Sequence, residues 1–170
     1  MRLFIALNFD EVNKDILAGI SRDLAGIALR GWPVSRQNYH ITLAFIGEST
    51  EIPTLCRCMD QAAGPAFSLI TAKLGSFRRN GGDILWLSLA PAPQLTALQM
   101  RLAAELKAKG FTLDNHAFRP HITLMREAVL PENFDFYAYT EHMPKLSQNM
   151  RKISLMKSER LNGRLLYSEI

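Results

Sequence analysis

The sequence has little cysteine. Its 170 residues include only Cys56 and Cys58, and residues two positions apart are too close for an ordinary disulfide bridge. We therefore expect two free thiols and a reducing, cytoplasmic setting. A chain of this length buries a sizeable core without such bridges. A scaffold held together by disulfides is excluded.

Long hydrophobic runs are also absent. No stretch approaches the roughly 20 apolar residues that a membrane-spanning helix needs, so we expect no membrane partner. The short apolar run at residues 3–7 is interrupted by Asn8 and Asp10, too early for a signal-peptide core. No linker or low-complexity segment divides the chain. We therefore expect one domain over residues 1–170, and a monomer.

Positive charge is only in modest excess. The chain has 20 Lys and Arg against 16 Asp and Glu, a net charge of +4. This excess favours anionic partners but is too small for a protein that coats nucleic acid. With 48% hydrophobic and 21% charged residues, the composition is typical of a folded globular domain. A phosphate-bearing substrate is the partner that this balance fits best.

Hydrophobic periodicity predicts both strands and helices. Alternating or continuous apolar runs predict strands over residues 3–8, 39–47, 67–77, 84–89, 116–126, 134–139, 153–156 and 164–168. Apolar residues at helical spacing predict helices from the capping residue Asp10 to about residue 27, over residues 53–63, and from residue 95 to Gly110. The Asn80-Gly81 pair between two strand-like runs predicts a hairpin.

A strand–helix–strand unit occurs twice, and its second strand carries His-Ile-Thr-Leu at residues 40–43 and again at 121–124. The repeat predicts two similar lobes of one domain, because each unit has too few apolar layers to stand alone. The groove between the lobes is the expected functional site. Alternation along a strand places His40 and Thr42 on one face, and His121 with Thr123 likewise.

Two imidazoles and two hydroxyls facing one ligand suit phosphodiester cleavage. Because imidazole titrates near pH 6.5, one ring can accept a proton while the other donates one. The hydroxyls of Thr42 and Thr123 would hydrogen-bond phosphate oxygens. A structural relic of duplication and a zinc site are the alternatives. No His-x-x-x-His or Cys-x-x-Cys motif accompanies the histidines, so we expect neither a metal nor a cofactor.

Residues around the two motifs are further candidates. Arg119, held extended by the following proline, is placed for a contact with phosphate, or for a carboxylate partner. Tyr39 would stack on a base or pack in the core. Strict alternation predicts that Phe45 belongs to the core and that Arg126 lies on the face opposite His121, at the surface. Arg79 would lie beside the hairpin turn.

The motif blocks carry a resemblance. Residues 32–34, residues 39–48 and residues 118–124 resemble the two signature blocks of the two-histidine (2H) phosphoesterase superfamily. The whole chain resembles its LigT-like bacterial RNA 2',3'-cyclic phosphodiesterases, also described as 2'-5' RNA ligases. This resemblance implies an α+β, bilobal, duplicated fold, with antiparallel sheets lining a central cleft and helices packed outside.

The resemblance also implies an activity, namely hydrolysis of RNA 2',3'-cyclic phosphate ends to 2'-phosphate ends. By motif position, His40 would protonate the leaving 3'-oxygen, His121 would activate water, and Thr42 and Thr123 would hold the phosphate. The family is also associated with reversible 2'-5' joining of RNA ends. Alternatives are a 2H phosphodiesterase acting on a small cyclic nucleotide or an ADP-ribose cyclic phosphate, and a non-catalytic RNA-binding module.

Overall fold

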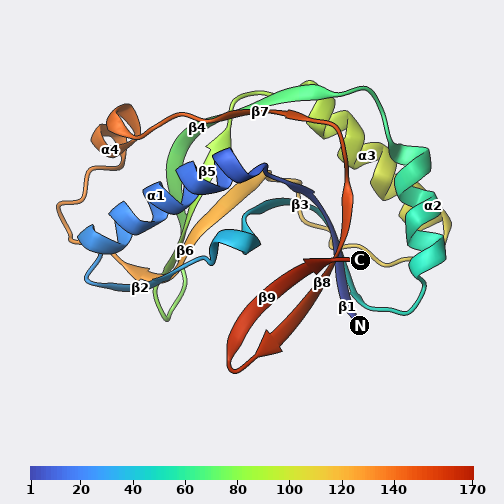
Figure 1. Ribbon diagram of the computed structural model, residues 1–170, viewed down its shortest axis with the longest axis horizontal. Helices are drawn as coiled ribbons and strands as arrows, with labels where there is room; N and C mark the ends of the chain where they lie inside the picture. Colours follow the sequence, from blue (N-terminus) through green and yellow to red (C-terminus); the bar gives the residue numbers. More distant parts are fainter.

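The computed structural model describes residues 1–170 as two sheets with helices on their outer sides (Figure 1). The strands are β1 (Arg2–Asn8), β2 (Arg30–Pro33), β3 (His40–Glu48), β4 (Phe67–Phe77), β5 (Asp83–Leu89), β6 (His121–Val129), β7 (Ser147–Met150), β8 (Ser154–Leu161) and β9 (Arg164–Glu169). The helices are α1 (Glu11–Ile27), α2 (Ile52–Ala62), α3 (Pro93–Ala108) and α4 (Phe136–His142), with a short 3-10 helix, η1 (Arg36–Asn38).

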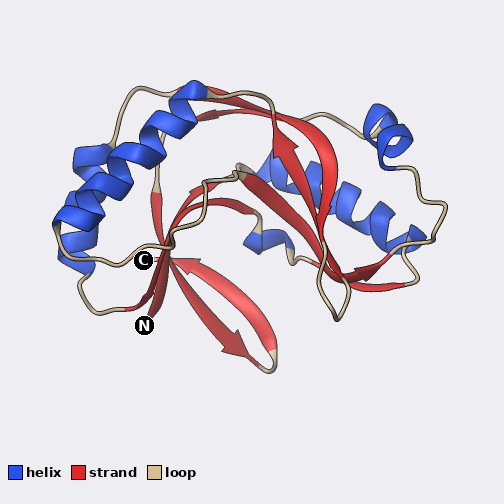
Figure 2. Ribbon diagram, turned by 180° about the vertical axis from the view of Figure 1, so that it is seen from behind, coloured by secondary structure: helices blue, strands red, loops and turns tan.

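All strand pairs are antiparallel. The four-stranded sheet has the order β3-β1-β8-β9, and the five-stranded sheet has the order β2-β6-β5-β4-β7. Figure 2 shows the β8–β9 hairpin extending away from the helical layers. The expected α+β fold with two antiparallel sheets is confirmed.

Each long helix covers the sheet of the other lobe. α1 follows β1 of the four-stranded sheet but packs against β2 and β6 of the five-stranded sheet. α3 follows β5 of the five-stranded sheet but contacts β3 and α2. The resulting core of 30 buried residues draws side chains from both sheets. None of the helices is long and apolar enough to cross a membrane.

Local signals explain most element boundaries. The Asp10 side chain accepts a hydrogen bond from the Asn13 backbone N–H at 2.8 Å, so α1 begins where its cap was expected. The strand predicted at residues 134–139 is wrong: this segment contains the start of α4. The Asp135 side chain caps α4 by accepting a hydrogen bond from the Ala138 N–H at 2.9 Å. The aromatic residues of this segment are typical of a strand, so the composition did not indicate the capped helix.

Other differences concern short or irregular segments. The strand predicted over residues 116–126 begins only at His121, because Pro120 precedes it and residues 116–120 form no regular structure. β2 and β7, of four residues each, were not predicted. Strands this short carry too few residues for an alternation pattern.

Candidate active site

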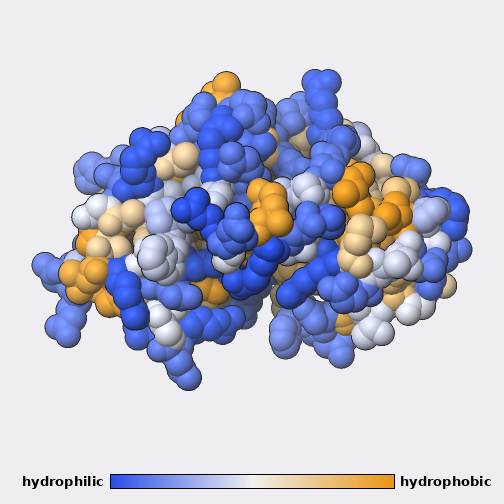
Figure 3. Space-filling view, turned by 60° about the horizontal axis from the view of Figure 1, so that its bottom comes forward, coloured by the Kyte–Doolittle hydropathy of each residue, from blue (hydrophilic) through white to orange (hydrophobic).

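The two motif strands belong to different sheets, yet β3 and β6 lie next to each other. Two adjoining hollows open along them. One is lined by Thr42 of the first motif and His121 of the second, and the other by His40 and Thr123. Each hollow therefore combines a threonine from one motif with a histidine from the other. On the face turned forward in Figure 3, mostly hydrophilic residues border a depression between the two halves of the molecule.

His40 is held by both ring nitrogens. Its Nδ1 lies 2.6 Å from the Asn38 carbonyl oxygen, and its Nε2 lies 3.0 Å from Thr42 Oγ1. Because a carbonyl oxygen only accepts, Nδ1 carries the hydrogen, and the lone pair on Nε2 of the neutral ring accepts the hydrogen bond of the Thr42 hydroxyl. The ring also packs against Phe4 and edge-on against Tyr167, with centroids 4.9 and 5.1 Å away.

His121 repeats this arrangement on the other sheet. Its Nδ1–H donates to the Arg119 carbonyl oxygen at 2.7 Å, again two residues earlier. Its ring packs edge-on against Phe77 at 5.1 Å and beside Trp86 at 6.2 Å. Both histidines therefore leave Nε2 as the nitrogen available for proton transfer.

The surroundings of His40 disfavour its charged form. Burial, the largest cause, together with the positive charges of Arg126 and His121, lowers the pKa of His40 to about 4. The hydrogen bond to the Asn38 carbonyl opposes this shift. In the unliganded protein His40 is accordingly neutral at pH 7, and a bound anion is the natural counter-charge for its protonated form.

Each motif strand contains a β-bulge three residues after its histidine. In the β1–β3 pairing, Ile5 faces Ala44 and Ala6 faces Thr42, so Leu43 is the extra residue. In the β5–β6 pairing, Leu85 faces Met125 and Trp86 faces Thr123, so Leu124 is the extra residue. A bulge reverses the alternation beyond it, and the next exposed side chain returns to the histidine face.

Two alternation-based predictions are therefore wrong. Phe45 was expected in the core, but it is 58% exposed and lines the hollow that contains Thr42. Arg126 was expected on the face opposite His121, but it lines the hollow that contains His40 and Thr123. The bulges place both side chains at the site, and strand periodicity alone gives no sign of them.

Of the other residues singled out from the sequence, two arginines lie at the site and one tyrosine lies in the core. Arg119 lines the hollow with His121 and forms no ion pair with a carboxylate. Tyr39 is only 1% exposed and belongs to the core, so it packs rather than contacts a ligand in the cleft. Arg79 from the β4–β5 turn lines the same hollow as Arg119. Asn38, which was not predicted, lines the hollow with His40, together with Trp32, Arg160 and Arg164.

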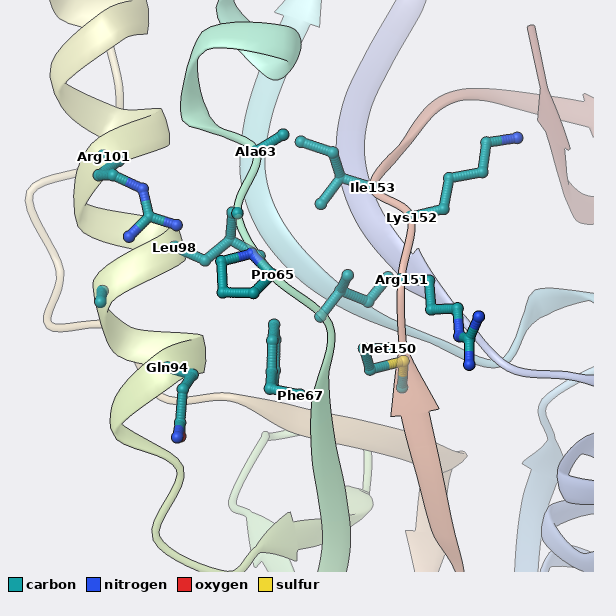
Figure 4. Close-up of a pocket in the computed structure, with 13 residues that line it drawn as sticks. Ala63, Pro65, Phe67, Gln94, Leu98, Arg101, Met150, Arg151, Lys152 and Ile153 are labelled. Carbon is teal, nitrogen blue, oxygen red and sulfur yellow. The ribbon is translucent and has the colours of Figure 1, made fainter.

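Another hollow, of about 140 Å³, lies outside this region, between α3 and the segments that follow α2 and β7 (Figure 4). Its lining includes no histidine, threonine or carboxylate, and the Arg151 and Lys152 side chains point away from it. No group of three or more His, Cys, Asp or Glu side chains is placed to hold a metal ion.

This fold and site define a class of protein. The profile of the 2'-5' RNA ligase superfamily matches residues 21–162. The chain belongs to this superfamily, and the resemblance seen in its motifs is confirmed.

Individual relatives narrow the comparison to the LigT-like branch. The chain is 33% identical over 130 residues to an RNA 2',3'-cyclic phosphodiesterase of Geobacillus stearothermophilus, covering 73% of this chain but only 41% of that protein. It is 31% identical over 150 residues to an RNA 2',3'-cyclic phosphodiesterase of Escherichia coli K12, covering 82% and 83%. The crystal structure of E. coli LigT complexed with 3'-AMP has a TM-score of 0.79 and 27% identity, covering 99% of this chain and 94% of that one.

Proposed function

We propose that this chain is a phosphodiesterase that converts RNA 2',3'-cyclic phosphate ends to 2'-phosphate ends without a metal ion. The observation that carries the proposal is the crossed lining of the two hollows, in which each histidine shares a hollow with the threonine of the other motif. Both histidines donate from Nδ1 to a backbone carbonyl, which leaves Nε2 as the nitrogen for proton transfer; in His40 this nitrogen is hydrogen-bonded to Thr42 Oγ1. The names of the two curated relatives support this substrate class.

In the proposed reaction, a water molecule attacks the phosphorus of the cyclic ester. His121 Nε2 accepts a proton from this water as the new P–O bond forms. The P–O3' bond breaks, and His40 Nε2–H donates its proton to the departing 3'-oxygen. The product carries a 3'-hydroxyl and a 2'-phosphate, and a proton exchange with solvent restores both rings. Thr42 and Thr123 donate hydroxyl hydrogen bonds to phosphate oxygens.

The low pKa of His40 fits the role of proton donor. Its protonated form is a stronger acid than an ordinary imidazolium, which favours transfer to an alkoxide leaving group. The negative charge of the bound phosphodiester supplies a counter-charge that favours the protonated form of His40. His40 thus gains its proton together with the substrate.

Unpaired cations support RNA as the substrate rather than a small cyclic nucleotide. Arg126, Arg160 and Arg164 line the His40 hollow, Arg119 lines the His121 hollow, and none of the four forms an ion pair within the protein. A cyclic phosphate is a chain end, so the RNA strand leaves it on one side only. The other hollow is free for water or, in 2'-5' joining, for the hydroxyl of a second RNA end.

The product of a short RNA with a cyclic end tests this function. We expect a cyclic-ended trinucleotide to yield a 2'-phosphate in the presence of EDTA, measured by chromatography against 2'- and 3'-phosphate standards. A cyclic mononucleotide serves as the comparison and is expected to react more slowly. A 3'-phosphate product, or dependence on added metal, would contradict the proposed mechanism. Faster turnover of the mononucleotide would favour the small-substrate alternative.

A further inference from the structure

Asn38 is a buried polar residue at the end of η1, two positions before His40. It is only 6% exposed, and a buried amide is costly unless its polar atoms are hydrogen-bonded. Its backbone carbonyl accepts the hydrogen of His40 Nδ1 at 2.6 Å. The direction of this carbonyl therefore decides where the catalytic ring is held.

The Asn38 side chain binds the last strand of the chain. Its Nδ2 donates to the Leu165 carbonyl oxygen at 2.8 Å, and its Oδ1 accepts from the Tyr167 N–H at 3.1 Å. β9 is an edge strand that pairs only with β8, so this amide acts as its partner on the open edge. The same contact places the Tyr167 ring edge-on against His40.

We propose that Asn38 is a positioning residue that docks the C-terminal β8–β9 hairpin and thereby fixes the His40 imidazole with its hydrogen on Nδ1. The side chain anchors the residue to β9, the anchored backbone directs its carbonyl at Nδ1, and Tyr167 closes the other side of the ring. If the carbonyl turned away, the hydrogen would be free to move to Nε2, and the ring would lose its orientation towards the substrate.

At His121, the residue whose carbonyl binds Nδ1 has no comparable side-chain anchor. Its Nδ1–H donates to the Arg119 carbonyl, and Arg119 belongs to a segment without regular structure. No side-chain hydrogen bond ties Arg119 to another strand. The positioning role therefore belongs to the His40 half of the site, and it makes the chain's last strand part of the catalytic framework.

Two variants separate positioning from general stability. Asn38→Ala removes both bonds to β9. Asn13→Ala is the matched control, because Asn13 is also 6% exposed and its side chain bonds β7 through the Ser147 carbonyl and the Gln148 side chain, outside the catalytic hollows. Because small displacements of catalytic groups cost large factors in rate, we expect Asn38→Ala to lower kcat on the cyclic-ended trinucleotide by roughly 10- to 100-fold with little change in KM. We expect Asn13→Ala to leave both parameters near the wild-type values.

Nitrogen-15 NMR of the histidine rings supplies a readout that does not depend on activity. We expect His40 to be in the Nδ1–H form in the wild type and in Asn13→Ala, and to lose this preference in Asn38→Ala; the His40→Gln spectrum assigns the signal. Asn38→Asp retains the acceptor for the Tyr167 N–H and serves if Asn38→Ala does not fold.

Unchanged His40 tautomer and kcat in a folded Asn38 variant would overturn the positioning role, as would equal losses in the Asn13 variant. The kinetic half of this inference rests on the proposed function. An inactive wild-type protein that nevertheless shows the Asn38-dependent tautomer would refute the proposed function and leave the positioning role intact.

Discussion

At the scale of residues, identical tetrapeptides produce unlike histidines. Both rings donate from Nδ1 to a carbonyl two residues earlier. Only His40 is anchored to β9 through the Asn38 side chain and shares its hollow with Arg126, and both β9 and Arg126 are remote from His40 in sequence. The repeat was sufficient to predict the four motif residues. It gave no information on the neighbours that distinguish the two rings.

The proton-transfer roles are tested by changing the leaving group. We expect His40→Ala and His121→Ala each to lower turnover of the cyclic substrate by about 10²–10⁴. With a substrate in which sulfur replaces the bridging 3'-oxygen, the thiolate leaves without protonation. We therefore expect the His40→Ala defect to shrink by at least tenfold in kcat, while the His121→Ala defect persists. Rescue of His121→Ala instead would reverse the two assignments.

At the scale of elements, the two β-bulges and the β8–β9 hairpin shape the site. Strand patterns predicted the positions of β3 and most of β6, but an alternation rule assumes regular pairing. Leu43 and Leu124 break that pairing, and each brings a further side chain, Phe45 or Arg126, onto the face that carries the motif histidine. The hairpin was predicted only in part, and its docking through Asn38 depends on tertiary contacts that no local pattern records.

The hairpin arginines are expected to bind the RNA strand that precedes the cyclic end. Because contacts between charged groups and phosphate contribute strongly to affinity, Arg160→Ala combined with Arg164→Ala should lower kcat/KM for a cyclic-ended trinucleotide roughly tenfold. The same pair should change kcat/KM for a cyclic mononucleotide less than about twofold. Arg57→Ala with Arg151→Ala removes equal charge outside the two hollows that contain the motif histidines and is the control. Equal effects on both substrates would contradict a role in strand binding.

At the scale of the whole molecule, the two lobes are joined by exchanged helices and one core. α1 packs on the sheet of the second lobe, and α3 packs on that of the first. The sequence repeat predicted paired lobes, but not this exchange, because a helix's apolar face does not indicate which sheet it covers. Since the core of 30 residues draws on both sheets, a local cost at the site should appear in the unfolding of the entire chain.

The acid sensitivity of folding follows from His40. Its pKa is about 4 in the folded protein, below the ordinary value of 6.5 expected on unfolding. Between these values the unfolded chain binds a proton that the folded chain does not, so the free energy of unfolding falls as the pH drops from 6.5 to 4. The full loss of unfolding free energy is about 3 kcal/mol, and it is absent above pH 6.5.

We expect His40→Gln to escape this loss, so that urea unfolding at pH 7.5 and at pH 4.5 shows a smaller difference for the variant than for the wild type. Altered packing in the variant acts at both pH values and cancels in the comparison, as do the carboxylates common to both proteins. Parallel declines in the two proteins would show that the buried imidazole does not carry this cost.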